Sequence, residues 1–349
     1  MAPLTATLAA SVAIGVGIVL ARATREREQA LRRRRERELG LHPGEAPAQA
    51  FKRMALGQAD LALELLEQGG REIPSEQAVH DTRKAIKRLR ALLRLLEDEL
   101  GSAVFARENA ALRKVAARLS GARDAEVMLS TLDALIERHP GKLRRRKGVR
   151  KLRRSLAMQR ERATSGTLDR KTVTRASAEL RAFRARTQAW NLPSMSEADV
   201  IAGGLTRLYE QGRKRHRRAA RRKGRDVEAM HDWRKRVKSL RYAAEMLERR
   251  MPNGLKPTAR AKRLKALARG ADDLGETLGE DHDLAMLGEL VRAAAKTEHG
   301  DLRSRSGRKT AKVLLKLIAR RRRKLRKRAL RDGQRLYGPS TKQLLRRLS

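Results

Sequence analysis

The chain has 349 residues, of which 84 are Lys or Arg and 40 are Asp or Glu, so its formal net charge is +44. Such a surplus attracts polyanions, and the partner classes to consider are nucleic acid, inorganic polyphosphate and anionic membrane surfaces. The chain has no cysteine, which excludes disulfides, thiol catalysis and thiolate metal sites. Leu and Ala dominate the apolar residues, and only 2% are aromatic. This composition predicts an all-α protein.

The chain begins with a hydrophobic segment. Residues 4–21 carry no charge and are about as long as the shortest transmembrane helix. The arginines that follow would keep the rest of the chain in the cytoplasm. We therefore predict a membrane anchor in residues 1–21, an Arg-rich stem over 22–44 and a body at the cytoplasmic face of the inner membrane. One alternative is a cleaved signal peptide, although the segment lacks a positively charged start. The other is an N-terminus that does not insert or is misassigned.

Helical periodicity fills the remainder, over residues 45–348. Residues 40–47 break any helix and precede this body, and residues 190–193 divide it into a first half over about 45–190 and a second over about 197–348. Helices are predicted over about 48–68, 76–100, 103–119, 123–138 and a segment reaching 186 in the first half, and over about 197–222, 227–250, 258–278, 282–298 and 308–336 in the second.

A basic motif occurs twice, beginning at His80 and at His231, 151 positions apart. At about 100° per residue of helix, the His and the cations at +3, +4, +7 and +10 occupy about 120° of the surface, and apolar residues such as Ile86 and Leu89 lie opposite. Two such helices facing one another across a shared cavity would bind a polyanion. The candidate ligands, called the stripe residues below, are His80, Arg83, Lys84, Lys87 and Arg90, and His231, Arg234, Lys235, Lys238 and Arg241.

A second segment also recurs, since residues 119–128 parallel residues 278–287. The two recurrences together indicate a duplicated helical bundle. Arg123 and His282 occupy corresponding positions in this segment. They either extend the rim of the basic site or pair with a carboxylate inside each bundle.

Other charged and aromatic residues have simpler interpretations. The basic runs over 142–154 and 213–225 lack the periodicity of the stripe, and we interpret them as solvated helix ends or loops. Tyr209, Trp233 and Tyr242 are expected in the core. An acidic cluster invites a divalent cation, but pairing with arginine is expected in so basic a chain, and we predict neither metal nor cofactor. The cluster comprises Asp272, Asp273, Glu276, Glu280, Asp281 and Asp283.

The doubled motif, with the Arg123-Asp124 and His282-Asp283 segments, resembles the CHAD family of conserved-histidine α-helical domains over about residues 45–348. The resemblance implies duplicated antiparallel helical bundles, related by a pseudo-twofold around a central basic cavity. It also implies binding of inorganic polyphosphate, location at polyphosphate granules and a ligand role for the stripe residues. Lys84 and Lys235 depart from the family pattern, because many members carry an apolar residue there. No Glu-x-Glu-x-Lys signature occurs, so the resemblance implies no catalytic activity.

The leading hypothesis is a non-enzymatic protein that binds inorganic polyphosphate through the two repeated helices. A basic, nucleoid-type nucleic-acid-binding protein is the alternative, because charge alone would suffice. Few aromatic residues are available for stacking on bases, and no helix-turn-helix pairing is evident. An enzyme acting on polyphosphate would need a carboxylate-bound metal or an activated nucleophile near the stripe, and the sequence displays neither.

Overall fold

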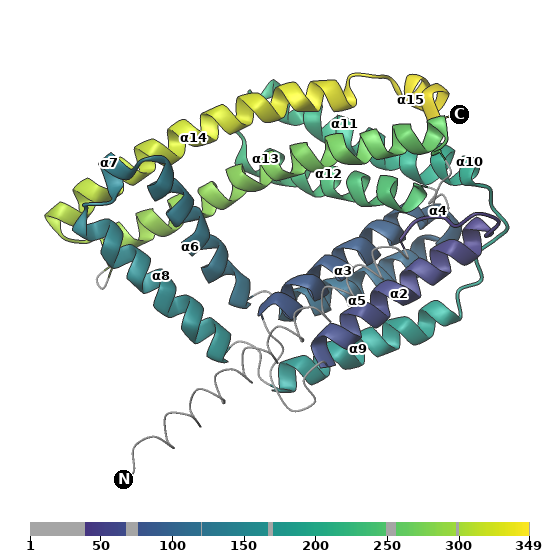
Figure 1. Ribbon diagram of the computed structural model, residues 1–349, viewed down its shortest axis with the longest axis horizontal. Coiled ribbons are helices and arrows are strands. Elements are labelled where there is room, and N and C mark those ends of the chain that lie inside the picture. The colour runs from purple at the N-terminus through teal and green to yellow at the C-terminus, as the bar shows by residue number, and fades with distance from the viewer. Residues whose placement is uncertain are drawn as a thin grey trace, which may run out of the picture.

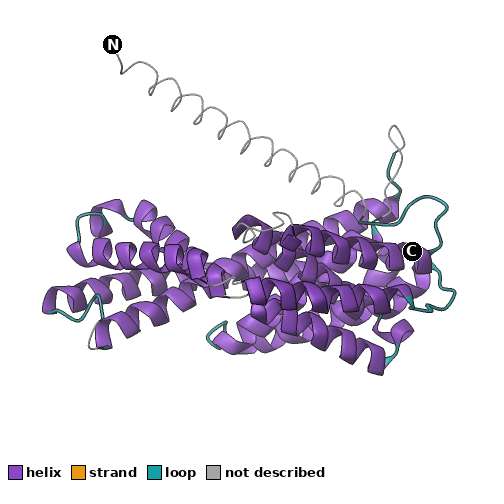
Figure 2. Ribbon diagram, turned by 90° about the horizontal axis from the view of Figure 1, so that it is seen from below, coloured by secondary structure: helices purple, strands orange, loops and turns teal. Residues whose placement is uncertain are grey.

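The computed structural model describes residues 39–67, 76–119, 121–166, 170–248, 256–297 and 300–348. Within these ranges every regular element is a helix, as Figure 2 shows, which confirms the all-α prediction. The first elements are α2 (Pro47–Glu67), α3 (Glu76–Leu95), α4 (Glu97–Leu100), α5 (Ser102–Arg118), α6 (Gly121–Arg138), α7 (Pro140–Leu143), α8 (Lys147–Gly166) and α9 (Arg170–Gln188). They are followed by α10 (Glu197–Val200), the π-helical turn η1 (Ile201–Leu205), α11 (Thr206–Arg221), α12 (Val227–Leu247), α13 (Ala259–Lys296), α14 (Arg305–Tyr337) and α15 (Thr341–Leu348).

The helices pack in three groups, which form the sides of a triangle in Figure 1. In the first group, α2 and α5 each pack against both α3 and α9. In the second, α6 and α8 pack together and against α13 and α14. In the third, α12 packs on α11 and α13, and α14 covers α11 and α13. Because α12 also packs against α3, the two helices that carry the basic motif lie beside one another.

Two apolar cores hold these groups together. One extends through the first and third groups and includes Phe51, Leu93 and Trp233. The other joins α6 and α8 to parts of α13 and α14, with Leu132 and Leu287 fully buried. The apolar positions predicted from helical spacing on α3 are the ones buried, since Ile86 and Leu89 are each 1% exposed. The burial of these residues therefore determines which face of α3 points away from the core.

Helix α13 corrects the sequence prediction, because it runs unbroken for 38 residues where two helices, 258–278 and 282–298, were expected. Gly275 and Gly279 remain helical, and they face α12 rather than ending the helix. A Cβ at Gly279 would lie 3.5 Å from Nη2 of Arg234, so the missing side chain leaves room for that guanidinium. The corresponding segment of the first half does break, between α5 and α6.

The helix predicted over 197–222 is also interrupted, by the π-helical turn η1. A Cβ at Gly204 would overlap the carbonyl oxygen of Leu95. Glycine at this position therefore allows the backbone to touch the end of α3. That contact places η1, and the start of α11 that follows it, against the end of α3.

The predicted membrane anchor in residues 1–21 lies outside the described residues, as does most of the stem. Among the helices of the part that the structure describes, none combines the length and hydropathy needed to cross a membrane.

Candidate functional site

Each basic helix is held by its apolar side. At the start of α12, the Asp226 side chain accepts a hydrogen bond from the Ala229 N–H at 2.9 Å, which caps the helix. Val237 and Leu240 are completely buried on the core side of α12. This packing directs the stripe residues of α12 away from the core, as Ile86 and Leu89 do for α3.

The two stripes meet at Lys87. Its side chain is accessible to solvent, but surrounding protein atoms remove part of the water around the ammonium. This desolvation, followed by the charges of Arg83 and Arg234, lowers the pKa of Lys87 to about 8, while Asp283 acts in the opposite direction. Cations from α3 and α12 therefore repel one another across the contact between the helices.

Two cations that the sequence reasoning missed extend this crowded region. Desolvation, Arg90 and Arg236 lower the pKa of Arg94 to about 10, and Arg94 donates a hydrogen bond to the carbonyl of Arg90 at 2.8 Å. Arg94 lies four residues after Arg90 and continues the same helical face, which the sequence could have shown. Arg236 lies off the stripe face of α12, so only packing reveals its position.

Several stripe residues already have protein partners. Arg83 donates to the carbonyl oxygen of Leu119 at 2.7 Å, and Arg90 donates to Oδ1 of Asn109 at 3.0 Å. Lys235 lies 3.3 Å from Oδ1 of Asp232. Arg241 pairs with Glu245 at 2.7 Å and with Asp272. These contacts hold the helices in place, and the half-buried His80, Lys84 and Lys238 on the same faces also interact with the surrounding protein.

The structure places His282 beside the second stripe. Its ring stacks on that of His231, with centroids 4.6 Å apart and planes 30° apart. Burial and the nearby cations Lys235 and Arg234, together with His282, lower the pKa of His231 to about 4. Burial and Arg234 also lower the pKa of His282. Arg123, the other candidate for the rim, has its side chain outside the described residues.

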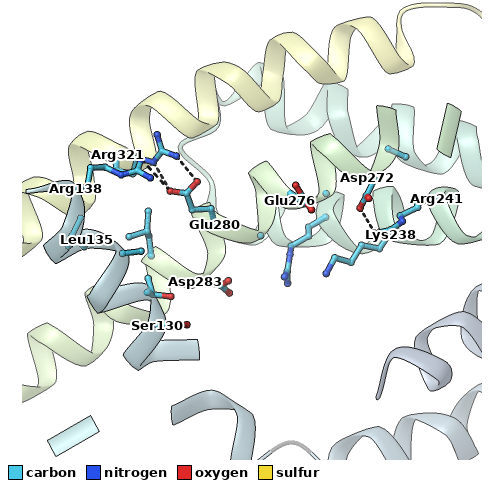
Figure 3. Close-up of a pocket in the computed structure, with 17 residues that line it drawn as sticks. Ser130, Leu135, Arg138, Lys238, Arg241, Asp272, Glu276, Glu280, Asp283 and Arg321 are labelled. Atoms are coloured by element: carbon cyan, nitrogen blue, oxygen red, sulfur yellow. Dashed lines mark hydrogen bonds and ion pairs between the residues drawn. The ribbon is translucent and has the colours of Figure 1, made fainter. Parts of the chain in front are cut away.

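A pocket of about 540 Å³ lies between α6, α12, α13 and α14 and includes Arg234, Lys238 and Arg241. Figure 3 shows that carboxylates reach into the same pocket, with Asp272 paired to Arg241 and Glu280 paired to Arg321. Its lining has five cations and four carboxylates. This end of the stripe is therefore nearly balanced in charge, and the cationic surplus lies toward Lys87.

Glu280 and Asp281 of the acidic cluster pair with arginines, as the interpretation of that cluster expects. Arg321 grips Glu280 with two hydrogen bonds of 2.6 Å, and the buried Asp281 pairs with Arg322 at 3.0 Å and Arg326 at 3.1 Å. The described residues include no group of three or more His, Asp or Glu side chains placed to hold a metal ion. The three aromatic residues expected in the core, Tyr209, Trp233 and Tyr242, are all buried.

The two basic runs differ from one another. Arg145, Lys147 and Arg150 are exposed at or near the start of α8, which fits a solvated helix end. The second run forms the C-terminal part of α11 and the turn that follows, and its exposed cations also fit a solvated helix end. The prediction that it lacks helical periodicity was wrong. The buried side of that helix includes Gly212, His216 and Ala219. Opposite them, Lys214, Arg217, Arg218 and Arg221 have the spacing i, i+3, i+4 and i+7 of an amphipathic helix.

Comparisons with known proteins identify relatives by sequence and by structure. A family model described as CHAD domain matches residues 55–292. The crystal structure of the CHAD domain from the plant Ricinus communis is 22% identical in sequence, with a TM-score of 0.59 over 87% of this chain and 96% of that one. PptA from Streptomyces chartreusis is 17% identical, with a TM-score of 0.56 over 84% of this chain and 100% of that one. At these identities the solved structures show a shared fold. No curated protein matches the sequence.

Proposed function

The chain belongs to the CHAD domain family, and from that premise we propose that it binds inorganic polyphosphate along the adjoining basic faces of α3 and α12, without catalysing a reaction on it. The resemblance drawn from the doubled motif implies this ligand for the family. A linear phosphate chain carries negative charge on every unit, so it suits cations repeated at each helical turn. Arginine can offer two parallel hydrogen bonds to phosphate oxygens, and lysine adds a compact charge.

The observation that carries the proposal is the crowding of cations at Lys87. Arg83 on the same helix and Arg234 on α12 both lower its pKa, so these groups raise one another's energy when no anion is bound. A polyanion placed between α3 and α12 would remove this repulsion. Binding energy is therefore available at the contact of the two helices, beyond what net charge alone would give.

Two further observations support the choice of ligand and the lack of catalysis. Tyr209, Trp233 and Tyr242 are buried, so they do not offer a surface for stacking on nucleic-acid bases. Asp272 and Glu280 pair with Arg241 and Arg321, which engages two of the four pocket carboxylates that a metal-dependent phosphotransfer site could use.

A charge-removal variant tests the proposal. We would replace Lys84, Lys87, Lys235 and Lys238 by Gln, leaving the arginines that hold the helices. Four lost phosphate contacts at about 1 kcal/mol each should weaken binding of long-chain polyphosphate at least about a hundredfold. The matched control replaces four exposed cations of the first basic run by Gln and removes the same charge, namely Arg145, Lys147, Arg150 and Arg154.

The control should weaken binding only modestly, through general electrostatic attraction. Equal losses in the two variants would overturn the proposal and indicate a general polycation. Competition between long polyphosphate and duplex DNA at physiological salt distinguishes polyphosphate binding from the alternative function, nucleic-acid binding. Preference for DNA would favour a nucleoid-type protein.

A further inference from the structure

The outer face of α11 forms a second concentration of cations, apart from the stripe residues. It lines a pocket of about 830 Å³ that contains seven cations and only two carboxylates. This pocket has a larger surplus of positive charge than the one beside Arg234 and Lys238, where five cations face four carboxylates. Its lining residues are Glu210, Arg213, Lys214, Arg215, Arg217, Arg218, Arg221, Arg222, Asp226 and Thr341.

Only some of these cations form hydrogen bonds or ion pairs with other described residues. Arg213 donates to the carbonyl of Tyr337 at 3.1 Å, and Arg218 lies 3.9 Å from Asp226. Four others are exposed and form no hydrogen bond or ion pair with the part of the chain that the structure describes, namely Lys214, Arg217, Arg221 and Arg222. Of the two carboxylates, Glu210 accepts a hydrogen bond from the Thr341 hydroxyl at 2.9 Å. Most of the positive charge of this face is therefore not balanced by the carboxylates of the pocket.

The pocket is separated from the stripe by the packing of α11 on α12. His216 lies on the buried side of α11, and its ring is 5.0 Å from that of the buried Trp233 on α12. Trp233 precedes Arg234 by one residue, or about 100° of helix, so the side of α12 that meets α11 is not its stripe face. Lys214, Arg218 and Arg221 lie on the opposite side of α11 from His216. These three cations therefore face away from the stripe, whereas Arg215, at the edge of the pocket, is close enough to Arg236 of α12 to add to the effect of burial in lowering the pKa of Arg236.

We propose that the pocket on α11 is a second binding site for linear phosphate polyanions, so that one protein molecule holds two chains, or two stretches of one chain, at the same time. The choice of ligand rests on the proposed function. Six of the seven cations are arginines, whose planar groups match phosphate oxygens, and no aromatic side chain lines the pocket. A protein with two such sites links phosphate chains together instead of only coating one.

Counting the sites for a short ligand tests this directly. Tripolyphosphate is too short to occupy both surfaces, and calorimetric titration of the full chain should give a stoichiometry of two. A variant with Lys214, Arg217, Arg221 and Arg222 replaced by Gln should lose one site and keep the other. The variant with the four stripe lysines replaced should lose the remaining one, and a combination of both should lose both. Circular dichroism confirms that each variant remains folded.

Light scattering with long-chain polyphosphate gives a second readout. Wild type should scatter strongly through cross-linking, whereas the α11 variant should bind the polymer with little scattering. Retention of both sites by the α11 variant, or a stoichiometry of one in wild type that only the stripe variant abolishes, would overturn this inference while leaving the proposed function intact. Loss of binding in the α11 variant, with none in the stripe variant, would instead overturn the proposed site on α3 and α12.

Discussion

Raising the pH from about 7 to about 9 should weaken polyphosphate binding, and Lys87 should account for most of the change. Its pKa is lowered from 10.5 to about 8 without ligand, so the ammonium loses its proton across this interval in the free protein. A bound polyanion would restore the pKa toward its ordinary value. Binding at pH 9 therefore requires uptake of a proton that is already present at pH 7.

The size of the effect follows from linkage between proton and ligand binding. Full restoration of the pKa would reduce the affinity about tenfold over these two pH units. Because the Lys87 side chain is accessible to solvent, screening lowers this figure, and we expect about a three- to fivefold loss. The groups that set the shift lie on three helices, namely Arg83 on α3, Arg234 on α12 and Asp283 on α13.

The assay is fluorescence anisotropy of labelled long-chain polyphosphate at constant ionic strength, since the interior phosphates of a long chain stay ionised throughout. Lys87→Arg should bind with similar affinity at pH 7 and with little change at pH 9, because a guanidinium keeps its charge. Lys147→Arg, an exposed residue near the start of α8, should retain the pH dependence of wild type. The same pH dependence in Lys87→Arg as in wild type would refute the reasoning.

Three further predictions concern stability. The pKa of His231 is lowered from 6.5 to about 4, so the stability gained from the neutral ring is present above pH 6.5 and is lost as the pH falls through that interval. His231→Gln should therefore reduce the loss of unfolding free energy between pH 7 and 5 by about 1 kcal/mol. An unchanged dependence of the unfolding free energy on pH, measured by urea unfolding, would contradict this. Asp281→Asn should lower the free energy of unfolding by about 3–5 kcal/mol, because the two arginines of α14 that pair with this buried carboxylate lose their counter-charge. A decrease below about 1 kcal/mol in denaturant unfolding would exclude this role of Asp281 as their counter-charge. Gly333→Ala would bring a Cβ within 2.5 Å of the Trp233 ring and should cost about 1–3 kcal/mol. Gly270→Ala, whose Cβ would make an ordinary contact at 3.4 Å, should be neutral or stabilising in thermal unfolding, and an equal loss at both positions would argue against a steric cause.

Helical spacing was sufficient to predict the all-α fold and the buried sides of the motif helices, because burial of Ile86 and Leu89 depends on periodicity within one helix. It did not predict the single helix α13, because a break was expected between residues 278 and 282, where Gly279 instead packs against Arg234 within the helix. The amphipathic face of α11 was present in the spacing of its cations, but the density of Arg and Lys in the run obscured it.

The candidate site was predictable only in part. The motif located the cations on each helix, and Arg94 was readable as an extension of the first copy. The repulsion between Lys87 and Arg234 depends on how α3 meets α12, which two separate segments of sequence do not specify. The ligand role of the stripe residues stays a prediction, and the predicted anchor lies outside the described residues.

Helix α13 gives the molecule a mechanical property. At about 1.5 Å per residue its 38 residues form a rod about 57 Å long. Leu264 and Leu274 belong to one core and Leu287 and Val291 to the other, so the two cores share a continuous backbone. Gly279, against which Arg234 rests, lies near the middle of the rod. A load applied to either core is therefore transmitted past the stripe of α12, and the two cores should lose their structure together, as one cooperative unit.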